Sequence, residues 1–220
     1  MSKMVWDQIS EKRYETGIEQ VALFQQVGGA YPKGVAWNGV TALNLAPSGA
    51  EPTPLYANNR KYLTLMSVEE LGGTIEAYTY PDEWAECDGS ATVIAGVYIG
   101  QQARKSFGLA AKTIIGNDTE LNKFGYKLHL IWGGLASPSE QENATINDSP
   151  EAKTMSWEFS TTPVAVNGYE STSYMYIDST VVDAEKLKAL EAIIYGSDDV
   201  EPRLPLPNEI IELMGAEVAG

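Results

Sequence analysis

The chain has 220 residues, and no shift in composition divides it, so we predict one domain over residues 1–220. It contains 30 acidic and 15 basic residues, for a formal net charge of -15. This balance excludes a general nucleic-acid-binding surface, because phosphate affinity comes mainly from Lys and Arg. It favours solubility and mutual repulsion of free subunits.

Neither a targeting segment nor a membrane span is indicated by the sequence. Residues 1–15 contain no apolar run, so we expect no signal peptide. The most apolar window, residues 91–100, is too short to span a bilayer. The single cysteine, Cys87, permits no internal disulfide and fits synthesis in a reducing cytosol.

Apolar and polar residues alternate in several segments, which is typical of strands with one buried face. We predict strands over residues 19–27, 73–80, 106–115, 126–132, 153–161 and 172–179, with a further apolar run over 35–45. In the segment 73–80, Ile75 and Ala77 are expected on the buried face. Glu76, Tyr78 and Tyr80 are expected on the polar face, and Pro81 should end regular pairing.

One segment has the pattern of a helix. Asp183 is a suitable N-cap, Leu187 and Leu190 follow at helical spacing, and Gly196 fits the C-terminal end. The prolines beyond it predict an irregular C-terminal tail over residues 197–220, with a short helical segment at 209–214. Seven or eight strands and one helix predict a mainly β fold, a sandwich or barrel with one flanking helix.

Residues 46–61 have the composition of a long projecting loop or hairpin. Three prolines favour extended conformations in the first half, and Asn58 and Asn59 are turn formers. Arg60 and Lys61 give this segment the densest positive charge nearby. Loops longer than about a dozen residues are usually functional or disordered. A second polar loop is expected over residues 133–150.

The candidate catalytic and metal-binding residues are few. His129 is the only histidine, so no metal cage is apparent, and we interpret it as structural. Glu86 and Asp88 should raise the pKa of Cys87, which favours a passive thiol. The acidic stretch around Trp84 does not fit an EF-hand, and G-x-S-x-G, Walker and Rossmann motifs are absent. We therefore expect no catalytic residue, no metal and no cofactor.

The aromatic residues allow two interpretations. Trp84, Trp132 and Trp157 could form a sugar-binding platform on a β-sandwich, or they could pack in the core and at a subunit interface. Core packing is the preferred interpretation. A carbohydrate-binding module stays open as the alternative function, and an acid/base hydrolase using two of the many carboxylates is a further one.

Several segments carry a family resemblance. They are GVAWNGVTALNLAPSGAEPTPLYANNRKY, GGTIEAYTYPDEWAECDGSA, IGQQARKSFGLAAKTIIGNDTE, GYKLHLIWGG, INDSPEAKTMSWEFSTTPV, VDAEKLKALEAIIYG and RLPLPNEI. In this order they resemble the major tail proteins of long-tailed phages and prophages of Gram-positive bacteria. The resemblance covers about residues 34–211, and it assigns no role to residues 1–30.

The resemblance implies a structural subunit of the phage tail tube. In that family a β-sandwich with one flanking helix forms six-membered rings, which stack into a hollow tube around a tape-measure protein. The tube contacts tail terminator and distal tail proteins and conducts DNA during ejection without binding it specifically. The expected location is the tail of the virion, after assembly in the host bacterial cytoplasm and without a membrane partner. The family has no catalytic residues to carry over.

Two sets of residues are then candidates for sites. The proline-containing loop should reach an adjacent subunit, mainly in the next ring, through these residues: Pro47, Glu51, Pro54, Tyr56, Asn58, Asn59, Arg60 and Lys61. Glu76 is a candidate to line the lumen, whose wall we expect to be net negative, so that DNA slides without adhering.

Overall fold

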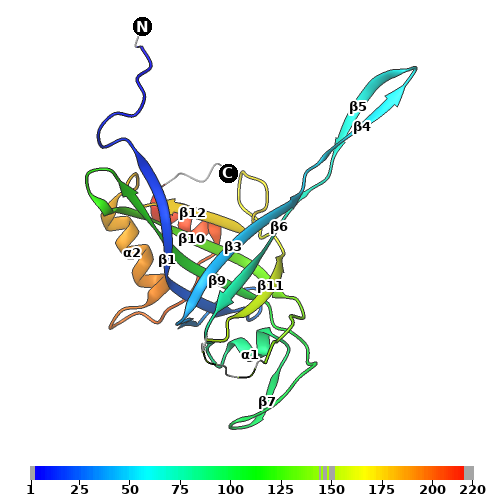
Figure 1. The fold of residues 1–220 in the computed structure, drawn as a ribbon, viewed down its shortest axis with the longest axis vertical. Coiled ribbons are helices and arrows are strands. Elements are labelled where there is room, and N and C mark those ends of the chain that lie inside the picture. The colour runs from blue at the N-terminus through cyan, green and yellow to red at the C-terminus, as the bar shows by residue number, and fades with distance from the viewer. Residues whose placement is uncertain (1–2, 144, 146–147, 149–151, 216–220) are drawn as a thin grey trace.

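The computed structural model describes residues 3–143, 145, 148 and 152–215, and its fold is mainly β (Figure 1). The strands are β1 (Arg13–Gln25), β2 (Gly34–Ala36), β3 (Val40–Gly49), β4 (Pro52–Ala57), β5 (Arg60–Met66), β6 (Glu69–Ala77), β7 (Ala91–Ile94), β8 (Val97–Ile99), β9 (Phe107–Asn117), β10 (Leu121–Ala136), β11 (Met155–Thr161) and β12 (Tyr174–Asp178). The helices are α1 (Trp84–Cys87), α2 (Ala184–Tyr195) and α3 (Pro207–Met214).

Eight strands form one antiparallel sheet. The order is β2-β1-β9-β10-β11-β6-β3, and β12 also pairs with β10. Strand β10 divides the sheet into two leaves, because residues 127–131 pair with β12 whereas residues 134–136 pair with β11. The bend lies at Gly133, which has a φ of +65°. A Cβ atom there would lie 2.1 Å from the carbonyl oxygen of Thr162, so only glycine fits.

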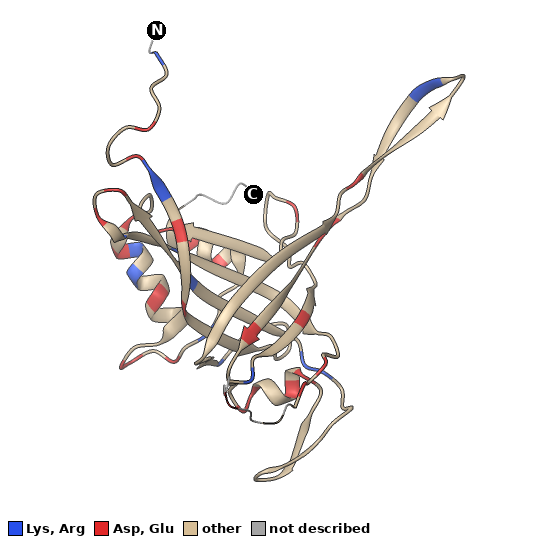
Figure 2. Cartoon of the chain, in the orientation of Figure 1, with Lys and Arg blue, Asp and Glu red and all other residues tan. Residues whose placement is uncertain are grey.

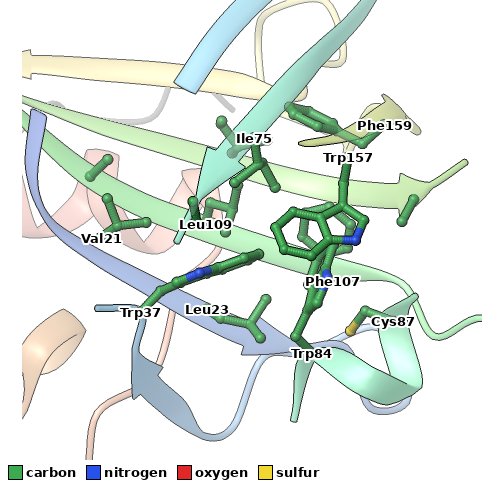
Figure 3. Packing of buried hydrophobic residues seen from close by; sticks show 14 residues of the cluster. Val21, Leu23, Trp37, Ile75, Trp84, Cys87, Phe107, Leu109, Trp157 and Phe159 are labelled. Atoms are coloured by element: carbon green, nitrogen blue, oxygen red, sulfur yellow. The ribbon is translucent and has the colours of Figure 1, made fainter. Parts of the chain in front are cut away.

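A cluster of aromatic side chains fills the space between the two leaves (Figure 3). The ring of Trp84 lies 4.6 Å from that of Trp37, 5.5 Å from Trp157 and 5.0 Å from Phe107. Trp37, Trp84, Phe107 and Trp157 are all buried. The expected burial of Ile75 and Ala77 on one side of their strand is confirmed, and Trp157 and Phe159 of β11 are buried in the same cluster.

The opposite face of the sheet is covered by helices (Figure 1). Leu128, Leu130 and Trp132 of β10 pack in one cluster with Leu187 and Leu190 of α2. The helix begins as predicted, because the carboxylate of Asp183 accepts hydrogen bonds from the backbone N–H groups of Glu185 and Lys186, both at 3.0 Å. It ends at Gly196, whose φ is +82°.

The short helical segment predicted at 209–214 is confirmed. Residues 207–214 form α3, and Ile210 of this helix packs into the same cluster as α2. Pro207 occupies the first helical turn, where the missing N–H group costs no hydrogen bond. The expected single flanking helix is thus accompanied by a second one.

Other differences concern the strands. The first strand starts at Arg13 rather than near residue 19, and the apolar run over 35–45 is divided into β2 and β3. The acidic stretch after Pro81 contains the short helix α1. The apolar window over 91–100 forms a separate hairpin, β7–β8, which the sequence pattern did not assign to strands.

The aromatic cluster gives a first prediction. Trp84→Ala should lower the free energy of unfolding by about 3–5 kcal/mol, because a large buried side chain leaves a cavity between the leaves. Trp6→Ala is the matched control, since Trp6 is 75% exposed, and it should leave stability unchanged. Urea denaturation measures both; equal effects of the two substitutions would contradict this description of the core.

Candidate functional site

The most conspicuous surface feature is a long β-arm that extends from the sheet (Figure 1). Strands β3 and β6 run past the core to Gly49 and Glu69, and β4 and β5 continue in the same direction as a separate two-stranded sheet. The arm ends in a two-residue turn, Asn58-Asn59, with positive φ angles of 51° and 59°. Positive φ angles at both central residues are typical of a type I′ turn, whose twist matches that of the two flanking strands. Asparagine tolerates these angles better than most residues do.

Of the two forms predicted for the projecting segment, a long loop or a hairpin, the structure has the hairpin. Its prolines lie in strands: Pro47 pairs with Leu71 in β3–β6, and Pro52 and Pro54 pair with Met66 and Thr64 in β4–β5. A two-stranded ribbon has two free edges, so a proline without an N–H group can occupy an outward-facing position. The returning half, residues 62–70, also belongs to the arm, as the alternation of Leu63, Thr64 and Leu65 could have indicated.

The structure brings the predicted contact residues together on this one arm, and all of them are exposed. Pro47 lies in β3, Glu51 in the break between β3 and β4, Pro54 and Tyr56 in β4, Asn58 and Asn59 in the turn, and Arg60 and Lys61 in β5. Tyr56 is the cross-strand partner of Lys61 near the tip. Their contact with another subunit stays a prediction.

The face of the leaf β3-β6-β11 that points away from the aromatic cluster is polar and acidic, and its residues other than glutamate have short side chains. Register positions that share this face with Glu76 are Ala42, Asn44, Ala46 and Ser48 on β3, Glu70, Gly72 and Thr74 on β6, and Ser156, Glu158 and Ser160 on β11. None of these positions is Lys or Arg. Glu70, Glu76 and Glu158 form no ion pair with a cation in the part of the chain that the structure describes.

The grouping of Tyr80 with Glu76 is wrong. The ladder ends at Ala77, so strand alternation does not continue to residue 80. The ring of Tyr80 instead packs edge-on against Trp157, with 5.7 Å between ring centroids, on the side of the buried cluster. Glu76 itself lies on the polar face as expected, opposite Ser156.

His129 belongs to a hydrogen-bonded cluster that joins β1, β9, β10 and β12. Its Nε2 atom lies 2.7 Å from the Thr113 hydroxyl and its Nδ1 atom 2.7 Å from the Tyr174 hydroxyl. The Thr113 hydroxyl donates to the carboxylate of Glu15 at 2.6 Å, and Lys127 also donates to this carboxylate. Because Thr113 has only one proton to donate, Nε2 donates to Thr113 and Nδ1 accepts from Tyr174, as a neutral imidazole can.

The pKa shifts agree with this assignment. Burial lowers the pKa of His129 from its usual value of 6.5, although Glu15 acts in the opposite direction. Burial opposes ionisation of Glu15, but the hydrogen bonds from Lys127 and Thr113 outweigh it and lower the pKa of the carboxyl. In a Ser-His-Asp triad the carboxylate binds the imidazole nitrogen that does not face the hydroxyl group. Here the carboxylate of Glu15 binds the hydroxyl of Thr113, on the Nε2 side of His129. The cluster fastens β1 to the sheet.

The remaining candidates lie in the core. Cys87 is buried, and burial raises its pKa to about 12, with Glu86 acting in the same direction. The direction agrees with the sequence-based prediction, but burial is the larger cause. Trp84, Trp132 and Trp157 are also buried, so they form no sugar-binding platform. The preferred interpretation, core packing, is confirmed for these three residues.

The described residues include neither a metal-binding cluster nor a membrane-spanning helix. They contain no group of three or more His, Cys, Asp or Glu side chains suited to a metal ion. Among the described helices, none has the length and apolar character needed to cross a membrane. Comparison with known proteins found no matching family model and no matching curated protein.

The lowered pKa of His129 predicts a pH dependence of stability. The unfolded chain binds a proton near pH 6.5 that the folded chain binds only at lower pH, so the free energy of unfolding should fall as the pH decreases below about 6.5. His129→Gln removes this contribution and should weaken the dependence. Thermal unfolding between about pH 7 and pH 5.5 measures it; identical pH profiles for both proteins would show that His129 does not titrate in this way.

Proposed function

We propose that the chain is a structural subunit of a phage tail tube, which assembles as hexameric rings stacked around a tape-measure protein and forms the conduit for DNA ejection. The observation that carries the proposal beyond the sequence resemblance is the β4–β5 arm. Tail terminator and distal tail proteins would bind the ends of the tube. The virion tail would be the location of the protein, after assembly in the cytoplasm of the bacterial host.

The arm has the properties of a segment that is stabilised by a neighbouring molecule. Isolated two-stranded hairpins are marginally stable in water, yet this one extends for six paired residues, or about 20 Å, beyond the sheet. Leu55, Tyr56, Tyr62, Leu65 and Met66 are exposed along it. A set of apolar side chains this large on a projecting ribbon favours a protein interface. Stacking of rings would supply one for every copy.

The edges of the main sheet also favour assembly. Within the described residues, β3 hydrogen-bonds along its length only to β6, and β12 only to β10. Exposed edges invite pairing with other chains, and closed rings are one way to cover them. Identical subunits that bind head to tail form either closed rings or open filaments. A tube requires both, because subunits close into a ring around the axis and rings stack along it.

The polar face of β3-β6-β11 is our candidate for the wall of the lumen. It carries the carboxylates of Glu70, Glu76 and Glu158 and no cation. Lys and Arg are the side chains that hold phosphate, so their absence would let DNA pass without adhering. Short side chains also keep such a wall smooth. The net charge of -15 gives the whole subunit the same sign as DNA.

The carbohydrate-binding alternative has lost its basis in the aromatic residues, since its three tryptophans are buried. No arrangement in the described residues favours it specifically.

Negative-stain microscopy of concentrated protein tests the proposal. Six-membered rings or hollow tubes are expected, because each weak contact is repeated around a ring and acts together with its copies. Dispersed monomers over the whole accessible concentration range would contradict a tube-forming function.

Shortening the arm should separate folding from stacking. Replacement of residues 52–66 by a short Gly-Ser turn removes β4 and β5 and leaves both buried clusters intact. We expect a folded subunit that forms no long tubes, as judged by circular dichroism and microscopy. Tubes of normal length at the normal concentration would show that stacking depends on other segments, of which the polar loop that follows β10 would be the next candidate.

The lumen assignment predicts the effect of charge reversal. Glu76→Lys, combined with Glu158→Lys, should leave ring formation intact but slow DNA passage, because two cations per subunit would then contact phosphates. DNA release from assembled particles measures this effect. Glu212→Lys is the control, because it reverses the same kind of charge on α3, which packs on the helix-covered face of the sheet. A tube structure with Glu76 on the outer wall would contradict the assignment.

A further inference from the structure

A second projecting hairpin, β7–β8, leaves the molecule at the end opposite the arm, next to α1 (Figure 1). Its two strands pair only with each other, through Ala91–Ile99, Thr92–Tyr98 and Ile94–Val97. Five large apolar side chains are exposed on it: Val93, Ile94, Val97, Tyr98 and Ile99. Ile94 is the most exposed of them, at 64%.

This hairpin is also without charge. Residues 91–102 contain no Asp, Glu, Lys or Arg, although 20% of the whole chain is charged (Figure 2). Exposed apolar strands without charged residues are prone to pair with other chains, and soluble proteins usually protect them. A two-stranded hairpin with no covering layer is also marginally stable by itself. The hairpin therefore has the character of an interface.

The arm presents a matching surface. Leu55 and Leu63 are cross-strand partners, and Thr53 and Leu65 are the next pair on the same face. The three leucines thus form a row on one side of β4–β5, which we call the leucine face. Each of the three is exposed. Pro54 and Thr64 lie on the other side of the ribbon.

Charge complementarity selects another copy of this chain as the partner of each hairpin. The arm segment 52–66 contains Arg60 and Lys61 and no acidic residue, so its charge is +2. The rest of the chain carries -15 minus +2, or -17. A cationic arm is attracted to the acidic body of another copy. Next to β7, the segment around α1 contains Asp82, Glu83, Glu86 and Asp88 (Figure 2). Glu83 and Glu86 are paired with Lys33 and Lys105, and Arg104 lies near Asp88. Asp82 is exposed and forms no ion pair within the described residues, so it is the carboxylate here that can attract the cationic arm.

We propose that the β7–β8 hairpin of one copy receives the leucine face of the arm of the next copy. This inference rests on the proposed function, because it specifies the surface on which the stacking arm docks. The contact joins two different surfaces at opposite ends of one chain, so it is head-to-tail and continues along a stack. Two small hairpins bury far less than the roughly 800 Å² per partner of a standard interface. One contact alone is weak, and the repeated contacts of a ring hold the stack together.

Disulfide trapping between single substituted positions tests the inference. Leu65→Cys and Ile94→Cys are made in separate proteins, mixed under assembly conditions and oxidised. The native Cys87 is buried and does not interfere. The expected product is a mixed dimer of the two variants, and neither variant alone should give a cross-linked dimer. Thr64→Cys mixed with Ile94→Cys is the matched control, because Thr64 lies on the opposite side of the arm, and it should cross-link at least tenfold less.

The other outcomes would overturn the inference. Dimers formed by Leu65→Cys alone or by Ile94→Cys alone would show that like hairpins pair. Tubes that form without the mixed dimer would leave the proposed function standing and place the docking surface elsewhere. Dispersed monomers without cross-links would contradict both. Flotation of the protein with phosphatidylglycerol vesicles, abolished by Ile94→Lys, would assign the hairpin to a lipid surface instead.

Discussion

The fold depends on the packing of Trp37, Trp84, Phe107 and Trp157 between two leaves of one sheet. The leaves can enclose these rings only because β10 changes partners at Gly133, which sends β11 away from β12. Trp84 reaches the cluster from α1, so this short helix also belongs to the core. With the inside filled by aromatic rings and the other face covered by α2 and α3, the segments left to project are hairpins at the ends of the molecule (Figure 1).

The charges and the hairpins act in opposite directions on association. A net charge of -15 makes copies of the chain repel one another, which opposes non-specific association through the two exposed apolar hairpins. The hairpins themselves carry either no charge or the opposite charge, so repulsion is weakest where contact is proposed. This combination favours assembly that requires many simultaneous contacts over random pairing. Its balance depends on salt, because ions screen exposed charges beyond about 10 Å.

The sequence predicted the strands with clear alternation and the helix with a clear N-cap. Ile75 and Ala77 lie on the expected side because a buried face imposes a period of two on the residues. The end of alternation was harder to see: Tyr80 has the parity of Glu76 but lies beyond the ladder, and its exposed ring contacts the edge of the buried cluster at Trp157. Pro81 sets an outer limit to the pairing, but the local pattern does not show that the ladder already ends at Ala77.

Other features depended on context that a single segment does not contain. Three prolines favoured extended conformations but left a loop and a hairpin both possible, and the structure shows a narrow ribbon that accommodates them at its free edges. The β7–β8 hairpin has no alternation because no core lies beneath it. The polar face around Glu76 became visible only when register placed Asn44, Glu158 and Ser160 beside it. This polar face depends on pairing between distant segments, whereas the two hairpins are each formed by neighbouring segments.

Hydrogen–deuterium exchange of the β4–β5 arm tests most directly whether the chain is an assembly subunit. Amides of residues 52–66 are compared between dilute protein and protein at the concentration that forms rings or tubes, with the amides of β9 as an internal standard. The account predicts rapid exchange of the arm in dilute protein and protection of at least tenfold on assembly, because a neighbouring copy then covers the ribbon. Equal exchange of the arm at both concentrations would contradict it.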